Sequence, residues 1–120
     1  MSEAAERCGG QLWYYRTDVT KDEEVIDIFA SLSQPLRYPI RGLVTCAGVS
    51  LNGPSVEFPV ASFRRLMDIN AAGTFSVAQA VAREMQRTNV SGSMVFVASM
   101  SGHGSNKVIS SQPSLIEAHD

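Results

Sequence analysis

Ser99 is the first candidate for chemistry, because it follows a short apolar run that is typical of a buried strand. This run, Met94–Val97, is rich in β-branched and aromatic residues, and Gly92 and Gly102 bound it. In open α/β sheets, ligands bind outside the carboxyl ends of the strands, so Ser99 is a candidate site residue by position. The alternative is that Ser99 and Ser101 only end a strand and begin a turn, which is a common use of serine.

Asn70 is the second candidate, because its amide lies on the apolar stripe of an expected helix. A buried amide without hydrogen-bond partners costs about 1–3 kcal/mol, so Asn70 must be paired. The small residues Ala71–Gly73 that follow would let another element approach this helix closely. A purely structural role, in which Asn70 pairs with a neighbouring backbone carbonyl, is the alternative.

Other kinds of site are not supported by the residue spacing. The glycine-rich segment 102–107 completes neither phosphate-binding glycine motif, and no periodic helix follows it. A hydrolase elbow would need glycine two residues before the nucleophile, but Val97 precedes Ser99. His103 and His119 have no metal-ligand spacing with any cysteine or carboxylate, so we expect no metal site.

Three apolar segments are expected to be strands, and two periodic segments are expected to be helices. The strands are expected over residues 12–17, 42–47 and 93–98, and the helices over residues 21–33 and 62–87. This alternation is typical of a doubly wound α/β fold with parallel strands and right-handed crossovers. No repeat, linker or low-complexity tract divides the chain.

The first expected helix has a clear start and a single apolar face. Thr20 and Glu23 have the spacing of a capping box, in which each side chain bonds the other residue's backbone N–H. The residues that share the apolar face are Val25, Ile28, Phe29 and Leu32.

The composition is that of a globular protein, and the net charge of −2 argues against nucleic acid or an anionic membrane as the main partner. No apolar run approaches the length of a transmembrane helix. The chain opens without a secretory signal, and Cys8 and Cys46 have no paired spacing. We therefore expect a cytoplasmic protein with reduced thiols.

Four motifs in this order resemble the middle of a short-chain dehydrogenase/reductase. They are Asp18-Val19, Thr45-Cys46-Ala47-Gly48, Asn70-x-x-Gly73 and Ser99-x-x-Gly102, and each follows an expected strand or lies in the long expected helix. Each motif is weak alone, but the ordered set is fairly specific. The branch of the family that acts on sugar alcohols and ketoses is the one that this chain most resembles.

The resemblance implies hydride transfer between a nicotinamide cofactor, NAD or NADP, and a small carbonyl or alcohol substrate. In that case Asn70 would fix a helix kink and hold a water of the proton relay, and Ser99 would hydrogen-bond the substrate oxygen. The residues that would contact the cofactor are Asp18, Val19, Ala47 and Gly48.

The resemblance also implies a fold: a partial Rossmann-like, doubly wound parallel sheet in three α/β/α layers. Residues 1–104 would form the partial NAD(P)-binding domain, and residues 105–120 an irregular tail. The family's first two strands, which lie between the strand ending at Asp18 and the strand ending at Gly48, would be lacking, as would the C-terminal part. Two apolar strands would then face an empty slot, so we expect the isolated chain to be poorly stable.

The sequence departs from the family at the catalytic pair. The family's Tyr-x-x-x-Lys is absent: the tyrosines are Tyr14, Tyr15 and Tyr38, all upstream of Ser99. Two hypotheses follow. The chain is a member or truncated form of an NAD(P)(H)-dependent oxidoreductase that is inactive alone, or it is a non-catalytic piece that binds a full-length relative through the 62–87 helix. That helix would also be the surface for a homo-oligomer.

Overall fold

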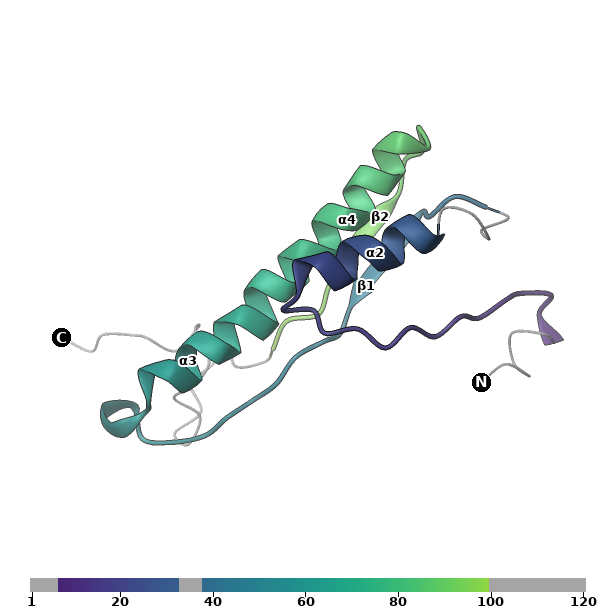
Figure 1. Ribbon diagram of the computed structural model, residues 1–120. Helices are drawn as coiled ribbons and strands as arrows, with labels where there is room; N and C mark the ends of the chain where they lie inside the picture. Colours follow the sequence, from purple (N-terminus) through teal and green to yellow (C-terminus); the bar gives the residue numbers. More distant parts are fainter. Residues whose placement is uncertain (1–6, 33–37, 100–120) are drawn as a thin grey trace.

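A computed structural model of the chain describes residues 7–32 and 38–99 (Figure 1). The expected tail over residues 105–120 lies outside the described residues. The elements, in chain order, are helix α2 (Asp22–Leu32), strand β1 (Gly42–Thr45), the short 3₁₀ turn η1 (Ser55–Glu57), helix α3 (Val60–Met67), the π-helix η2 (Asp68–Gly73), helix α4 (Thr74–Arg87) and strand β2 (Ser93–Phe96).

Strands β1 and β2 pair in parallel, with Gly42 opposite Ser93 and Thr45 opposite Phe96. The pairing extends beyond the strands, because the Ser93 amide donates to the Arg41 carbonyl at 3.0 Å and the Val97 amide donates to the Thr45 carbonyl at 3.2 Å. The helical segment between the strands forms the crossover that parallel strands require. The expected parallel pairing of the 42–47 and 93–98 segments is confirmed.

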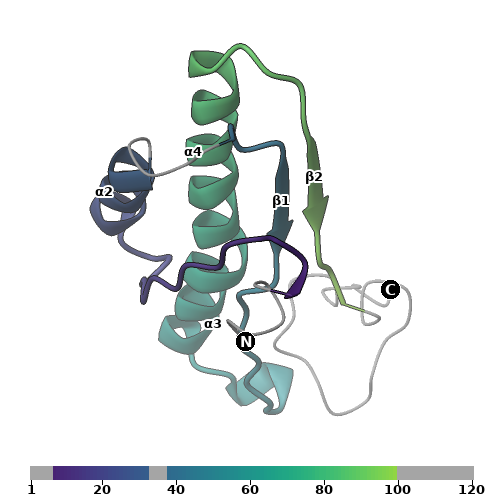
Figure 2. The same cartoon turned by 90° about the vertical axis from the view of Figure 1, so that its right-hand side faces the viewer.

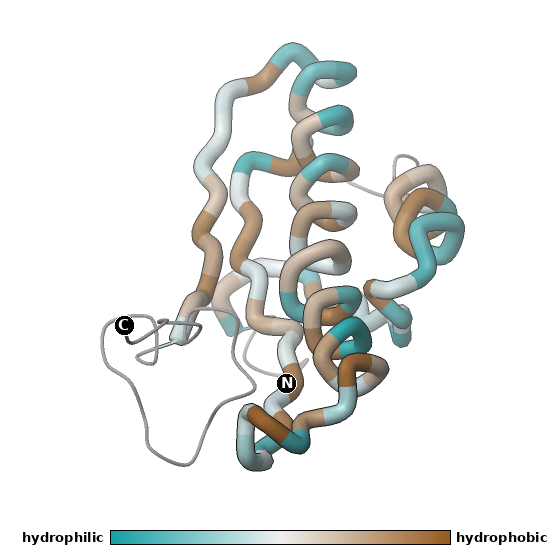
Figure 3. The backbone as a smooth tube through the Cα atoms, turned by 90° about the vertical axis from the view of Figure 1, so that its left-hand side faces the viewer, coloured by the Kyte–Doolittle hydropathy of each residue, from teal (hydrophilic) through white to brown (hydrophobic). Residues whose placement is uncertain are grey.

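Helices α3 and α4 and the π-helix η2 between them form one long rod, as expected over residues 62–87. Figure 2 shows α4 between α2 and the two strands, and α4 contacts both α2 and β1. The apolar stretches of the strands, brown in Figure 3, run beside this helix. The α/β class is therefore confirmed, and α2 and α4 lie on one side of the sheet in the described residues.

The core consists of a few apolar residues where α2 and α4 pack and where the rod meets the strands. The buried apolar residues are Val25, Leu66, Ala80, Val81 and Met85. Gly73 lets the rod approach the chain before α2, because a Cβ built there would lie 2.7 Å from Val19 Cγ2. Within residues 7–32 and 38–99, none of the helices has both the length and the apolar character needed to cross a membrane.

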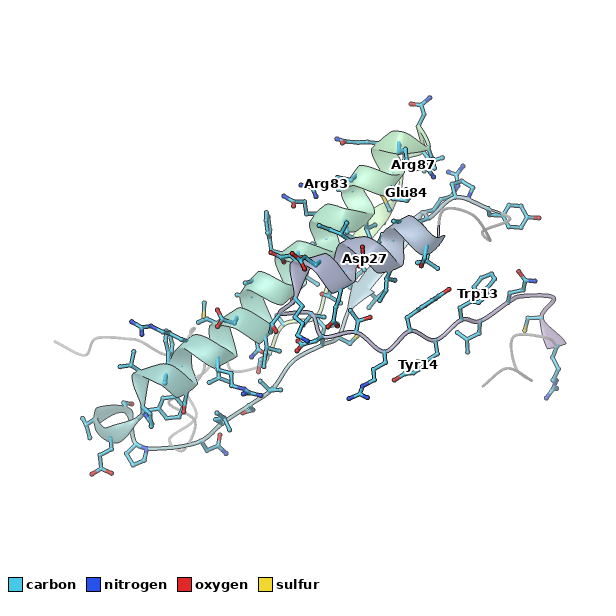
Figure 4. The ribbon with its side chains drawn as sticks, in the orientation of Figure 1. Trp13, Tyr14, Asp27, Arg83, Glu84 and Arg87 are labelled. Atoms are coloured by element: carbon cyan, nitrogen blue, oxygen red, sulfur yellow. The ribbon has the colours of Figure 1, made fainter. Side chains whose placement is uncertain are left out.

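The expected strand over residues 12–17 is wrong. This segment is extended but pairs with no strand of the described chain, and its apolar side chains project into solvent (Figure 4). Tyr14 is 83% exposed, and Leu12, Trp13 and Tyr15 are between 42% and 53% exposed. The composition of the segment is β-prone, but a strand is stabilised by a neighbour's backbone groups, and no strand among the described residues lies beside it.

The capping box expected at the start of α2 is also wrong. The Thr20 hydroxyl donates to the Asp18 carboxylate at 2.7 Å, and the Thr20 amide donates to the same oxygen at 3.0 Å. The carboxylate that turns back along the chain belongs to Glu24, which accepts the Asp18 amide at 3.1 Å. The turn before the helix is therefore built by Asp18, two residues before the Thr20 cap that the capping-box spacing suggests.

Candidate functional site

The Asn70 side chain holds the loop that follows β1. Its Oδ1 accepts the Val49 amide at 2.9 Å, and its Nδ2 donates to the Val49 carbonyl at 2.8 Å. Gly48 lies directly beneath this pair, because a Cβ built at Gly48 would lie 3.5 Å from Asn70 Oδ1. Both polar ends of the amide are thus used, and the backbone after β1 is fixed against the helical rod.

The helix is irregular at the position of Asn70. Residues Asp68–Gly73 form a π-helix, and the Thr74 amide bonds to the Ala71 carbonyl instead of continuing the α-helical pattern. The Thr74 hydroxyl donates to the Asn70 carbonyl at 2.9 Å. Short π-helical segments inside helices are frequent at functional sites, because they reposition the side chains they carry. Here the irregular segment carries Asn70 to the Val49 backbone.

A cavity of about 500 Å³ lies at the carboxyl edge of the sheet, between the turn before α2 and the end of β1. It is lined by Arg16, Thr17, Asp18, Val19, Lys21, Glu24, Ala47 and Ile69. Three residues singled out in the sequence, Asp18, Val19 and Ala47, therefore share one cavity. Its volume lies within the range of about 300–1,000 Å³ that is usual for small-molecule sites.

Charged groups at this cavity are arranged by short local hydrogen bonds. The Thr20 hydroxyl, with its backbone amide, holds the pKa of Asp18 below its ordinary value. Lys21 donates to Glu24 at 2.9 Å, which lowers the pKa of Glu24 and raises that of Lys21. Both carboxylates are thus ionised at neutral pH, and their positions are fixed by neighbours within one turn of chain.

A second cavity of about 240 Å³ adjoins the first and is mostly apolar. It is lined by Val19, Leu43, Val44, Thr45, Cys46, Ala47, Gly73, Thr74 and Val77. Val19 and Ala47 line both cavities, so these two small side chains separate the polar site from an apolar groove alongside β1.

Ser99 lies at the same edge of the sheet as Gly48. Gly48 follows the Thr45–Phe96 pair by three residues on one strand, and Ser99 follows it by three on the other. Because parallel strands end at one edge, Ser99 and Gly48 both lie at that edge. The motif partner Gly102 and the 102–107 segment lie outside the described residues.

Sequence reasoning missed several residues of this site. The partner of Asn70 is the Val49 backbone, which no side-chain pattern could reveal. Thr74 could have been found, because a hydroxyl four residues after Asn70 can reach its carbonyl within a helix. The cations Arg16 and Lys21 flank Asp18 in the sequence, but only the fold brings them to Ala47.

A family model for the short chain dehydrogenases matches residues 1–111, which is almost the whole chain. The chain belongs to this family. The resemblance carried by the four ordered motifs is thereby confirmed, and so is the Rossmann-like class of the fold.

Among curated relatives, the chain is 61% identical over 103 residues to the short chain dehydrogenase/reductase notP′ of Aspergillus versicolor. The match covers 86% of the chain and 35% of that relative, so the chain spans about a third of its length.

Solved structures of short-chain dehydrogenases superpose on most of the chain, in agreement with the family model. A short-chain type dehydrogenase/reductase from Mycobacterium ulcerans superposes with a TM-score of 0.81 at 31% identity, over 91% of this chain and 39% of that one. A xylitol dehydrogenase with bound NAD⁺ gives a TM-score of 0.77 at 31% identity, over 91% of this chain and 44% of that one.

Proposed function

We propose that this chain carries the adenosine-binding half of the site of an NAD(P)(H)-dependent short-chain oxidoreductase. The observation that carries this proposal is the cavity of about 500 Å³ shared by Asp18, Val19 and Ala47 at the carboxyl edge of the sheet. The dinucleotide would supply or accept the hydride, and the residues of the chain would bind and orient it.

The residues of the cavity fit part of such a cofactor. Asp18 offers an ionised acceptor to a donor such as an amino or hydroxyl group, and Arg16 and Lys21 offer positive charge to phosphate. Ala47 presents little side chain to the cavity, so a flat ring or a ribose can approach the backbone there, and Gly48, which follows it outside the cavity lining, adds no side chain. The pairing of Asn70 with Val49 holds this backbone in place, which limits the ordering cost of binding. These groups do not discriminate NAD from NADP.

At the substrate end, Ser99 would donate its hydroxyl proton in a hydrogen bond to the oxygen of a small carbonyl or alcohol. It would orient that oxygen but would not protonate it, because an ordinary hydroxyl is a poor acid at neutral pH. This sequence has no tyrosine after Ser99 that could act as the acid. We therefore propose that the 120-residue chain binds cofactor weakly and has no turnover by itself. A sugar alcohol or ketose is the substrate class that we favour for the whole protein.

The test is saturation-transfer NMR with NADH and with NADPH, followed by a turnover assay with xylitol and ketoses. We expect saturation of adenosine protons with the wild-type chain, and loss of that signal in Ala47→Phe, whose ring fills the cavity. Asp27→Ala removes an exposed carboxylate from α2 outside the cavity and is the matched control, so it should keep the signal (Figure 4). Saturation that is absent from the wild type, or unchanged in Ala47→Phe, would contradict the proposal.

A second candidate is a non-catalytic role in which the rod α3–α4 binds a full-length relative or another copy. The observation that favours it is Phe75, which is 66% exposed on α4, since aromatic side chains are enriched at protein–protein interfaces. Co-purification with a tagged full-length relative should be lost in Phe75→Ser and retained in Ile26→Ser. Retention of the complex in Phe75→Ser would exclude this surface. The cytoplasmic location expected from the sequence stays a prediction.

A further inference from the structure

One edge of strand β1 has no partner in the described chain. The carbonyls of Arg41 and Thr45 face β2, because they accept the Ser93 and Val97 amides. Backbone groups alternate in direction along a strand, so the amide and carbonyl of Val44 point to the opposite edge. The sheet ends at that edge within the described residues, and Val44 is 62% exposed.

An apolar groove runs along this open edge. The cavity of about 240 Å³ has its floor on β1 and its far wall on Val19 and on the rod at Gly73 and Val77. An unpaired strand edge beside an apolar groove is the arrangement that accepts an added strand: the backbone groups give the pairing, and alternate side chains fill the groove.

The chain itself contains a segment with the chemistry of such a strand. Leu12–Tyr15 is extended, apolar and aromatic, and it pairs with no strand in the described residues. It cannot reach β1 of its own chain while the turn after it stays intact. The Asp18 and Thr20 hydrogen bonds hold that turn to α2, and the cavity of about 500 Å³ separates Arg16–Val19 from Ala47.

Both the open edge and the extended segment leave apolar side chains in solvent. Val44 at the open edge is 62% exposed, Tyr14 is 83% exposed, and Leu12, Trp13 and Tyr15 are between 42% and 53% exposed. Each of these two surfaces can bury the other, and both lie on the same chain, so a second copy supplies the complement of each.

We propose that two copies of this chain exchange these segments. Leu12–Tyr15 of each copy adds as an edge strand to β1 of the other copy and places alternate side chains in the groove. The exchange is reciprocal, so the dimer is closed by a two-fold axis and leaves neither open edge exposed. The partner is thus a second copy of the chain, held by the sheet edge and not by the outer face of α4.

The first test is sedimentation equilibrium of the full chain up to about 200 µM, because association depends on chain concentration. The wild type should be a dimer. Val44→Pro removes an amide that points outward, keeps the β1–β2 hydrogen bonds, and should weaken the dimer at least tenfold. The double variant Leu12→Ser/Tyr14→Ser should do the same. Ile26→Ser and Phe75→Ser, each of which removes an exposed apolar side chain elsewhere, should leave the dimer intact.

Mixing the variants separates strand exchange from misfolding. The Val44→Pro chain has a defective edge and an intact segment, and the Leu12→Ser/Tyr14→Ser chain has the reverse. Each alone should be monomeric, and an equimolar mixture should form a heterodimer through the one intact junction. A wild type that stays monomeric would overturn the proposal. A mixture that stays monomeric would do so too, as would a dimer lost only in Phe75→Ser.

Discussion

The carboxyl edge of the sheet and the open edge of β1 lie a few residues apart but differ completely in how their backbone is satisfied. At the carboxyl edge, the amide and carbonyl of Val49 both bond to Asn70. At the open edge, the outward backbone groups of Val44 have no strand beside them in the described chain. One side chain satisfies the backbone hydrogen-bonding groups of the first region, whereas those of the second region need a neighbouring strand.

The difference shows what a partial α/β chain can build alone. Contacts that need only a side chain and a nearby loop form, because the rod and β1 are both present. Contacts that need a neighbouring strand form, within the described residues, only between β1 and β2, because a ladder is satisfied only by another backbone. The candidate cofactor cavity belongs to the first kind, and the expected strand at 12–17 belongs to the second.

Gly73→Val should destabilise the carboxyl edge of the sheet, with the largest loss of unfolding free energy among these substitutions. A Cβ at this position would lie 2.7 Å from Val19 Cγ2 and 3.0 Å from the Val19 carbonyl, so the rod would be pushed away from the cavity wall. Overpacking of this kind costs about 1–3 kcal/mol in unfolding free energy. Urea denaturation measures it. Gly42→Ala is the control, since the nearest atom to a Cβ there is 4.0 Å away. Equal stability of the two variants would contradict the close approach.

Asn70→Ala should come next. It leaves the Val49 amide and carbonyl without the partner at 2.9 and 2.8 Å, and water at this exposed loop replaces part of the loss. We expect a fall of about 1–2 kcal/mol in unfolding free energy. The Val49 amide should also exchange with solvent faster, by NMR-detected hydrogen exchange. An exchange rate unchanged by the substitution would show that Asn70 does not hold the loop.

Thr20→Val should have a smaller effect that depends on pH. The pKa of Asp18 in the folded chain is below its ordinary value of 3.8, chiefly because the Thr20 hydroxyl donates to it. A carboxylate whose pKa is lowered by folding stabilises the fold at pH values above its ordinary pKa. This stabilisation is lost as the pH falls through the lower pKa of the folded chain. In the variant, an NMR titration should show the pKa of Asp18 moving up toward 3.8. An unmoved titration curve would contradict the assigned cause.

Tyr14→Ala should have the smallest effect on a dilute, monomeric chain. Tyr14 is 83% exposed and lies in the unpaired segment, so its removal should change the unfolding free energy by less than about 0.5 kcal/mol. A loss above 1 kcal/mol in dilute solution, measured with urea, would show that the segment packs within its own chain and would remove the contrast between the two regions.

Much of the fold could be predicted from local pattern, and the exceptions have physical causes. The sequence pattern predicts the parallel strands before Gly48 and Ser99 and the helical crossover between them. This prediction holds because both strands and the crossover are present in the chain. The 12–17 segment has equally good strand composition, but composition does not tell whether a neighbour exists. At the start of α2, Glu23 and Glu24 are both acidic, and only the actual turn geometry selected Glu24.

The candidate site was predictable in part for the same reason. Asn70 was singled out because an amide on an apolar stripe needs partners, and the structure supplies them from Val49. The roles proposed for Asp18, Val19 and Ala47 rest on the cavity that they share. The sequence alone could not have shown that the turn before α2 and Ala47 line the same cavity.

Hydrogen exchange with and without cofactor tests the central claim most directly. The claim is that the cavity between the turn before α2 and the end of β1 holds part of a nicotinamide dinucleotide. Adding NADH or NADPH should slow amide exchange at Asp18, Val19 and Ala47, and should leave the far end of α4, at Gln86, unchanged. Exchange that does not respond to either cofactor, or that slows equally along the whole chain, would contradict the account.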